Sequence, residues 1–104
     1  MAQLKIVYWR DIPGQVVVRK AGRSTRIRLS AKFMRAIERA AYRLKKKEKD
    51  ALFEPWHDVN QPFNGNVSEQ ADVLVKHLEE HYTDDFLELL IRASGIDETR
   101  ALNG

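Results

Sequence analysis

The hydrophobic pattern of this chain changes its period near Ser30, and this change limits the fold more than any other feature. Residues 25–29 alternate basic and apolar side chains with a period of two, which is typical of a strand with one buried face. From residue 31 onward, apolar residues recur every three to four positions, as on the buried side of a helix. Strands followed by helices predict an α+β domain, in which helices cover one face of an antiparallel sheet.

Two more strands are expected before residue 25. Residues 3–10 and 15–20 are rich in β-branched and aromatic residues, and residues 11–14 (Asp-Ile-Pro-Gly) between them have the composition of a turn. They predict a hairpin, followed by the third strand over 25–29. Residues 56–61 are the candidate for an irregular edge strand, so the antiparallel sheet is expected to have three or four strands.

Three helices are predicted to pack on this sheet, over residues 31–47, 68–82 and 84–94. Ser68 is expected to cap the second helix, because a serine hydroxyl can accept from the first free backbone N–H groups. The third helix is expected to turn four residues inward: Phe86, Leu89, Leu90 and Ala93. The elements predict a single domain over residues 1–95 and a flexible C-terminal tail over 96–104.

The composition excludes several kinds of site and segment. The chain has 104 residues and no cysteine, which excludes disulfides, zinc–thiolate sites and iron–sulfur ligation by the chain itself. The longest apolar runs have three to four residues, and a membrane helix needs about 20. Residues 1–10 do not have the pattern of a secretory signal. We therefore expect a cytoplasmic protein that does not bind membranes and needs no cofactor.

The two halves of the sequence carry opposite charge. Residues 1–49 hold fifteen Lys and Arg against three acids, a net +12, and residues 50–104 hold three against twelve, a net −9. The net +3 of the whole chain hides this division. Such asymmetry points to an interaction surface.

Much of the positive charge falls on the first helix. One stripe of it carries five cations: Lys32, Arg35, Arg39, Arg43 and Lys46. Tyr42 lies within this stripe, and Arg26 and Arg28 lie on the solvent side of the preceding strand. Three explanations stay open: pairing with the acidic later helices, within the chain or between copies in a homo-oligomer; docking on an acidic protein; and binding to nucleic acid.

One motif resembles a catalytic signature. The run from His77 to His81 matches the H-x-x-E-H pattern of inverted zinc peptidases, in which two histidines hold the metal. Only 23 residues follow His81, too few for the body of such an enzyme. Phosphate-binding glycine loops and nucleophile-elbow motifs are absent from the sequence. We expect no enzymatic activity, and zinc at His77 and His81 is the minor alternative.

A family resemblance rests mainly on residues 6–16, Ile-Val-Tyr-Trp-Arg-Asp-Ile-Pro-Gly-Gln-Val. With the basic strand and the Arg/Ala-rich helix that follow, this segment resembles a small bacterial family labelled "virulence factor". Its members include stand-alone alphaproteobacterial chains, and a similar domain ends the staphylococcal conserved virulence factor proteins, behind a NifU-like region. The resemblance implies a link to one-carbon metabolism or cofactor assembly, and it supplies no catalytic residues.

The first functional hypothesis is a non-enzymatic accessory protein that docks on a larger partner through an aromatic hairpin and the basic helix. The predicted contact residues are Trp9, Arg10, Asp11, Pro13, Arg35, Arg39 and Arg43. The alternative for Trp9 is a place in the hydrophobic core.

The second hypothesis is a weak nucleic-acid-binding domain that uses the basic strand and the first helix. Its predicted contact residues are Arg26, Arg28, Lys32, Arg35, Arg39, Tyr42, Arg43 and Lys46.

Overall fold

The computed structural model describes residues 2–47 and 56–97, and within them the chain forms a four-stranded sheet and three helices. In chain order the elements are β1 (Gln3–Trp9), β2 (Ile12–Lys20), β3 (Arg23–Arg28), α1 (Ala31–Lys47), β4 (Trp56–Asn60), α2 (Val67–His81) and α3 (Asp84–Arg92). All neighbouring strands are antiparallel, in the order β3-β2-β1-β4. The predicted α+β fold is confirmed, with four strands.

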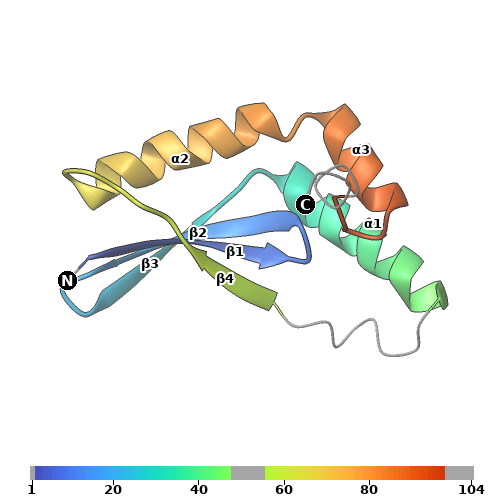
Figure 1. Ribbon diagram of the computed structural model, residues 1–104, viewed down its shortest axis with the longest axis horizontal. Helices are drawn as coiled ribbons and strands as arrows, with labels where there is room; N and C mark the ends of the chain where they lie inside the picture. Colours follow the sequence, from blue (N-terminus) through green and yellow to red (C-terminus); the bar gives the residue numbers. More distant parts are fainter. Residues whose placement is uncertain (1, 48–55, 98–104) are drawn as a thin grey trace.

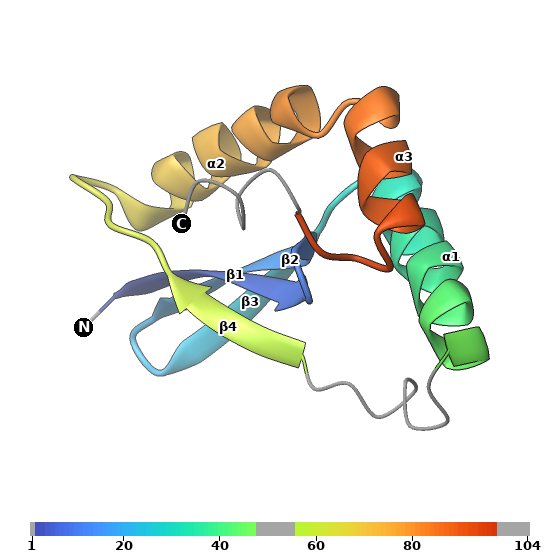
Figure 2. The same ribbon diagram turned by 45° about the vertical axis from the view of Figure 1, so that its right-hand side comes forward.

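The helices lie on one side of the sheet and beyond one of its ends. α2 runs along one face, and α1 and α3 pack together past the end at which β1 turns into β2 (Figure 1). Figure 2 shows the same arrangement from another side, with none of the described helices over the opposite face. This second face is called the open face below.

The first hairpin turns earlier than the sequence predicted. Trp9 pairs with Ile12, so the turn consists of Arg10 and Asp11, and β2 begins at Ile12 rather than at residue 15. Pro13 lies inside β2 opposite Tyr8, one step from the closing pair, where the backbone nitrogen of β2 points away from β1. Proline therefore removes no hydrogen bond to β1. The register shifts next to this pair, which makes the following residue, Gly14, the extra residue of a β-bulge.

The second hairpin connects β2 and β3 through a two-residue turn. Ala21 and Gly22 have φ of 52° and 78°, and Lys20 pairs with Arg23 across them. Two positive φ angles define the turn type whose twist suits a β-hairpin. The third strand thus begins two residues before the predicted position and ends one residue earlier, at Arg28.

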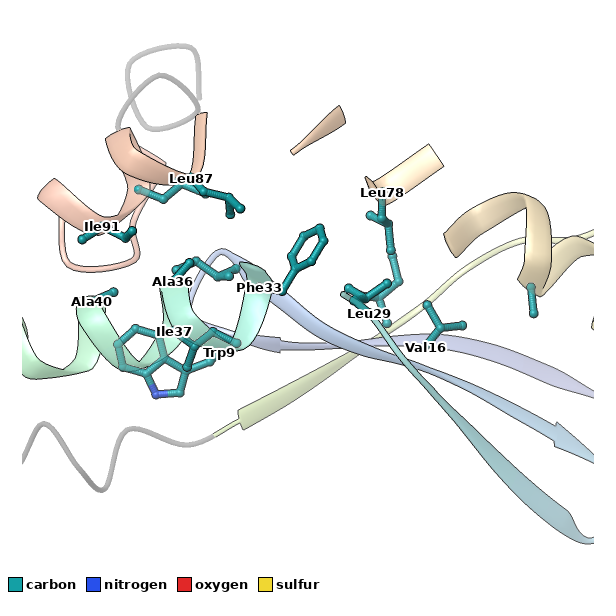
Figure 3. Packing of buried hydrophobic residues seen from close by; sticks show 14 of the residues in the cluster. Trp9, Val16, Leu29, Phe33, Ala36, Ile37, Ala40, Leu78, Leu87 and Ile91 are labelled. Atoms are coloured by element: carbon teal, nitrogen blue, oxygen red, sulfur yellow. The ribbon is translucent and has the colours of Figure 1, made fainter. Parts of the chain in front are cut away.

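The core forms where the sheet meets the three helices (Figure 3). Phe33, Ile37 and Ala40 are buried on α1, as the helical periodicity predicted. Trp9 is only 4% exposed and belongs to the same cluster. The predicted inward face of α3 was partly wrong. Leu89 is 61% exposed, and the buried residues of this helix are Leu87, Leu90 and Ile91, which share one face at i, i+3 and i+4 spacing.

Side-chain caps fix where α2 and α3 begin. The Asn66 side-chain oxygen accepts from the N–H groups of Ser68 and Glu69, at 2.9 and 3.1 Å. Asn66, not Ser68, is therefore the N-cap of α2. Thr83 caps α3 in the same way, because its hydroxyl accepts from the N–H of Phe86.

The segment after α3 is tied to the first hairpin. The Asp11 N–H donates to the Gly95 carbonyl at 2.8 Å, and the Asp97 N–H donates to the Asp11 carboxylate at 2.6 Å. Ile96 and Asp97, which were expected to begin a flexible tail, are described and partly buried. The rest of the predicted tail, residues 98–104, lies outside the described residues.

Candidate functional site

A cleft of about 710 Å³ opens where the open face of the sheet meets α1. Its size is within the range of small-molecule and peptide-anchor pockets. Strands β1 to β3, the start of α1 and β4 all contribute to it. The lining residues are Val7, Gly14, Gln15, Arg26, Arg28, Leu29, Ala31, Met34 and Trp56.

Trp56 and Met34 make the apolar part of the cleft. Each is 47% exposed, and both line the same cleft, where exposed apolar side chains that lie together are typical of a binding surface. The Trp56 ring lies over Gly14, so closely that a Cβ atom on Gly14 would stand 2.8 Å from its Cζ3 and 3.6 Å from Ile37. The bulge at Gly14 thus makes room for this ring, which presents its remaining surface to solvent.

Arginines supply the polar part of the cleft. Arg26 and Arg28 alternate along β3, so both side chains project from the open face toward the cleft. Among the described residues, neither guanidinium has an ion pair or a hydrogen bond. They belong to a larger group of exposed cations on β2 and β3, called the basic hairpin here: Arg19, Lys20, Arg23, Arg26 and Arg28. Neither strand carries an acidic residue.

Two cations of the α1 stripe, unlike Arg26 and Arg28 of the basic hairpin, pair with acidic residues of the described chain. Arg39 forms two parallel hydrogen bonds to the Glu88 carboxylate of α3, at 2.8 and 2.9 Å. These bonds hold the pKa of Glu88 below its ordinary value and raise the pKa of Arg39.

Lys32, at the start of the same stripe, contacts α2. Its ammonium donates to the backbone carbonyl of Glu79 at 2.9 Å and lies 3.9 Å from the Glu79 carboxylate. That carboxylate also accepts from the N–H and the hydroxyl of Ser30, each at 2.6 Å, at the N-terminus of α1 where negative charge is favoured. Pairing between the acidic and basic halves of the chain therefore explains Lys32 and Arg39.

The predicted contact residues of the first hairpin are mostly buried or bonded to other parts of the chain. Trp9 and Pro13 are buried, and a buried side chain cannot contact a partner of the folded chain. Asp11 holds the backbone of Gly95 and Asp97 through the bonds described above. Arg10 is half-buried in the same turn. The prediction that these four residues form an exposed docking surface is therefore wrong for Trp9 and Pro13, and Asp11 has a structural role.

The rest of the predicted basic surface is exposed on α1. Arg35 and Arg43 are exposed, and Tyr42 is 62% exposed. None of the three lines the cleft. Lys46 belongs to α1, and its side chain lies outside the described residues.

The two candidate zinc ligands stack on the surface of α2. The rings of His77 and His81 are 6.0 Å apart and nearly parallel, and His81 also packs edge-on against Tyr82 and Phe86. In the described part of the chain, no group of three or more His, Asp or Glu side chains could hold a metal ion. The zinc alternative therefore finds no third protein ligand there.

Sequence reasoning missed Trp56 and Met34. Trp56 is a lone aromatic in an edge strand, and it has no periodic apolar neighbours to indicate its exposure. Met34 lies between core residues of α1 and appears apolar like them. The sequence did indicate that Arg26 and Arg28 are exposed, because the alternation of residues 25–29 placed both on the solvent side of the strand.

The fold and the site together define a class of protein: a small α+β domain with a four-stranded antiparallel sheet, one helix along a face and two beyond an end, and a basic, partly aromatic cleft between the open face and α1. The family model described as "Virulence factor" matches residues 7–91, and the chain belongs to this family. The resemblance of residues 6–16 is thereby confirmed. No curated protein and no solved structure gives a significant match to the chain. In the described part of the chain, every helix is too short or too polar to cross a membrane.

Proposed function

We propose that this chain is a non-enzymatic accessory protein that acts in the cytoplasm and docks on an acidic surface of a larger protein through the cleft and the basic hairpin. The observation that carries the proposal is a pair of arginines, Arg26 and Arg28, that have no ion pair among the described residues. They lie beside two half-exposed apolar side chains, Trp56 and Met34. Tryptophan, arginine and methionine are enriched at the centres of protein interfaces.

The composition of the cleft defines the complementary surface. An apolar side chain of the partner fills the space between Trp56 and Met34, and carboxylates of the partner pair with Arg26 and Arg28. Both guanidiniums then exchange water for charged hydrogen bonds, which are among the stronger polar contacts at an interface. The acidic helices remain outside this contact, because no residue of α2 or α3 is among the residues that line the cleft.

This proposal keeps the docking function expected from the sequence. It assigns the contact to the cleft and the basic hairpin instead of the first hairpin and α1. Arg35 and Arg43 are exposed on α1 outside the cleft, whereas Trp9 and Pro13 lie in the core. The link to one-carbon metabolism or cofactor assembly stays a prediction.

Nucleic acid is the second candidate, favoured by one observation: the five exposed cations of the basic hairpin, which have no acidic residue on their strands. Single-stranded nucleic acids are held by several aromatic side chains in succession beside such charge. Among the described residues, one aromatic side chain lines the cleft, that of Trp56. We therefore favour a protein partner. Oligonucleotide binding that falls steeply with salt would support the second candidate instead.

The test is site-specific photo-crosslinking in cells that carry the protein naturally. A photoreactive methionine analogue at Met34 should link the chain to a partner, and Trp56→Ser or Arg28→Glu should remove that product. The matched control is Arg35→Glu, the same charge change at an exposed residue outside the cleft. A product that is equally abundant with all three substitutions would contradict the proposed surface.

A further inference from the structure

β3 is an edge strand with one unpaired side. The sheet order is β3-β2-β1-β4, so β3 pairs with β2 alone. An edge strand exposes a row of backbone N–H and C=O groups that can pair with another chain. Among the described residues, no backbone bond from elsewhere in the fold reaches β3.

The turn between β2 and β3 determines which groups are free. In a hairpin with a two-residue turn, the residues that flank the turn, Lys20 and Arg23, exchange backbone hydrogen bonds, and bonded pairs then alternate with non-bonded pairs. Thr25 and Ile27 therefore bond to β2. The N–H and C=O groups of Ser24, Arg26 and Arg28 point to the free edge.

The same alternation places the charges. Ser24, Arg26 and Arg28 also share the open face, because side chains at i and i+2 of a strand point to one side. Two of the three free backbone positions thus carry an arginine without an ion pair in the described chain, and both arginines line the cleft. The free backbone and the positive charge lie in register along one edge.

We propose that the partner's docking element is an extended acidic segment, which adds to β3 as a fifth strand. This inference rests on the proposed function and names the element that the surface recognises. Backbone bonds to Ser24, Arg26 and Arg28 supply affinity, as in other cases of strand addition. Carboxylates at every second position of the segment face Arg26 and Arg28, since cross-strand neighbours on one face lie about 5 Å apart.

Charge argues against a second copy of this chain as the added strand. Pairing β3 with β3 would set the arginines of one copy beside those of the other, and like charges directly opposite one another are destabilising. The other edge strand, β4, carries a single acid, Asp58, which lies 3.9 Å from Lys5 of its own sheet. An acidic segment of another protein pairs with the free backbone groups of β3 without this repulsion.

The test uses synthetic peptides and amide hydrogen exchange of the intact chain, followed by NMR. One peptide alternates glutamate and valine, and its control contains the same residues with all glutamates in one block. The alternating peptide at saturation should slow exchange of the Ser24, Arg26 and Arg28 amides by at least about tenfold. The Thr25 and Ile27 amides, already bonded to β2, should change far less.

Backbone variants separate strand addition from simple charge attraction. N-methylation of the peptide at the positions that face β3 should weaken binding by about fivefold or more, because each methyl group removes a hydrogen-bond donor. Ser24→Pro should weaken it similarly, and Ser24→Ala should not, since proline at an edge removes only the outward N–H.

The outcomes are distinguishable. If the alternating and block peptides bind equally and the three amides gain no protection, strand addition is overturned, while docking through the cleft is still judged by the crosslinks at Met34. If neither peptide binds but an oligonucleotide shifts the resonances of Trp56 and Arg28, strand addition and protein docking both fail.

Discussion

Replacing Gly95 with alanine tests whether Trp9 is a core residue or an adaptable surface residue. Gly95 has φ of 93°, in a region that side chains rarely adopt. A Cβ atom at this position would lie 2.6 Å from Cζ3 and 3.2 Å from Cε3 of Trp9. The indole is 4% exposed and cannot move aside without disturbing the cluster that contains it.

Two costs add in this variant. An alanine at positive φ costs about 1–2 kcal/mol, and an additional carbon in a filled core costs about 1–3 kcal/mol. We expect Gly95→Ala to lower the free energy of unfolding by about 2–5 kcal/mol, out of a total of about 5–15 kcal/mol for a domain of ordinary stability. The melting temperature should fall by about 4–8 °C per kcal/mol.

Gly65→Ala is the matched control. Gly65 has φ of 76°, and a Cβ atom there would meet nothing within 4 Å, so only the backbone cost applies. Urea denaturation followed by circular dichroism gives both free energies, provided that the dependence on urea is the same. A loss for Gly95→Ala no larger than that for Gly65→Ala would refute the packing of Gly95 on Trp9 and would return Trp9 to the candidate contact residues.

Three further predictions concern the cleft and the helix contacts. Gly14→Ala should push the half-exposed Trp56 ring outward, because the new Cβ atom would lie 2.8 Å from it; the chain should stay folded, its tryptophan emission should move to longer wavelength, and partner crosslinking should fall. An unchanged emission spectrum would contradict the contact. Asn66→Ala should lower the free energy of unfolding by about 1 kcal/mol through loss of the α2 cap, whereas Asn66→Asp should retain most of it. Because Arg39 lowers the pKa of Glu88 in the folded chain, the pair stabilises the fold above the unfolded pKa of glutamate, and this contribution disappears as the pH falls through the folded pKa. The difference in stability between the wild type and Glu88→Gln should therefore shrink in acid; a difference that is independent of pH would exclude the linkage.

Local sequence patterns predicted most of the helices and strands, but they predicted poorly the residues at which these elements begin and end. Local composition and spacing identified three strands and three helices. Residues 56–61 stayed a candidate edge strand, because all five residues of β4 are exposed and show no buried apolar face. Asn66 and Ser68 are both suitable cap residues, and so the choice between them depends on where α2 must bury Val67 and Ala71. The turn at Arg10 and Asp11 escaped prediction because residues 11–14 have the composition of a turn, whereas Pro13 lies inside β2 with its nitrogen pointing away from β1.

The candidate site was harder to predict than the fold. The sequence indicated a basic surface, and it could not separate the cations that pair internally from those that do not. Lys32 and Arg39 meet Glu79 and Glu88, which lie 47 and 49 residues further along the chain. Arg26 and Arg28 meet no acidic group in the described chain, since the strands beside them contain none. Only the packing of α3 on α1, and the contact between the end of α2 and the start of α1, make this distinction.

The sequence by itself determined the α+β class, the order of the elements and the division of charge between the two halves, because these depend on residue type and local spacing. The tertiary structure alone decided which of the two tryptophans is available for contact. Trp9 and Trp56 stand opposite one another on β1 and β4, yet one is buried and the other half-exposed. The segment after α3 closes over Trp9, with Gly95 against its ring, whereas Trp56 lies on Gly14 at the border of an open cleft. Burial of a side chain depends on contacts between segments far apart in the chain, and local sequence does not encode them.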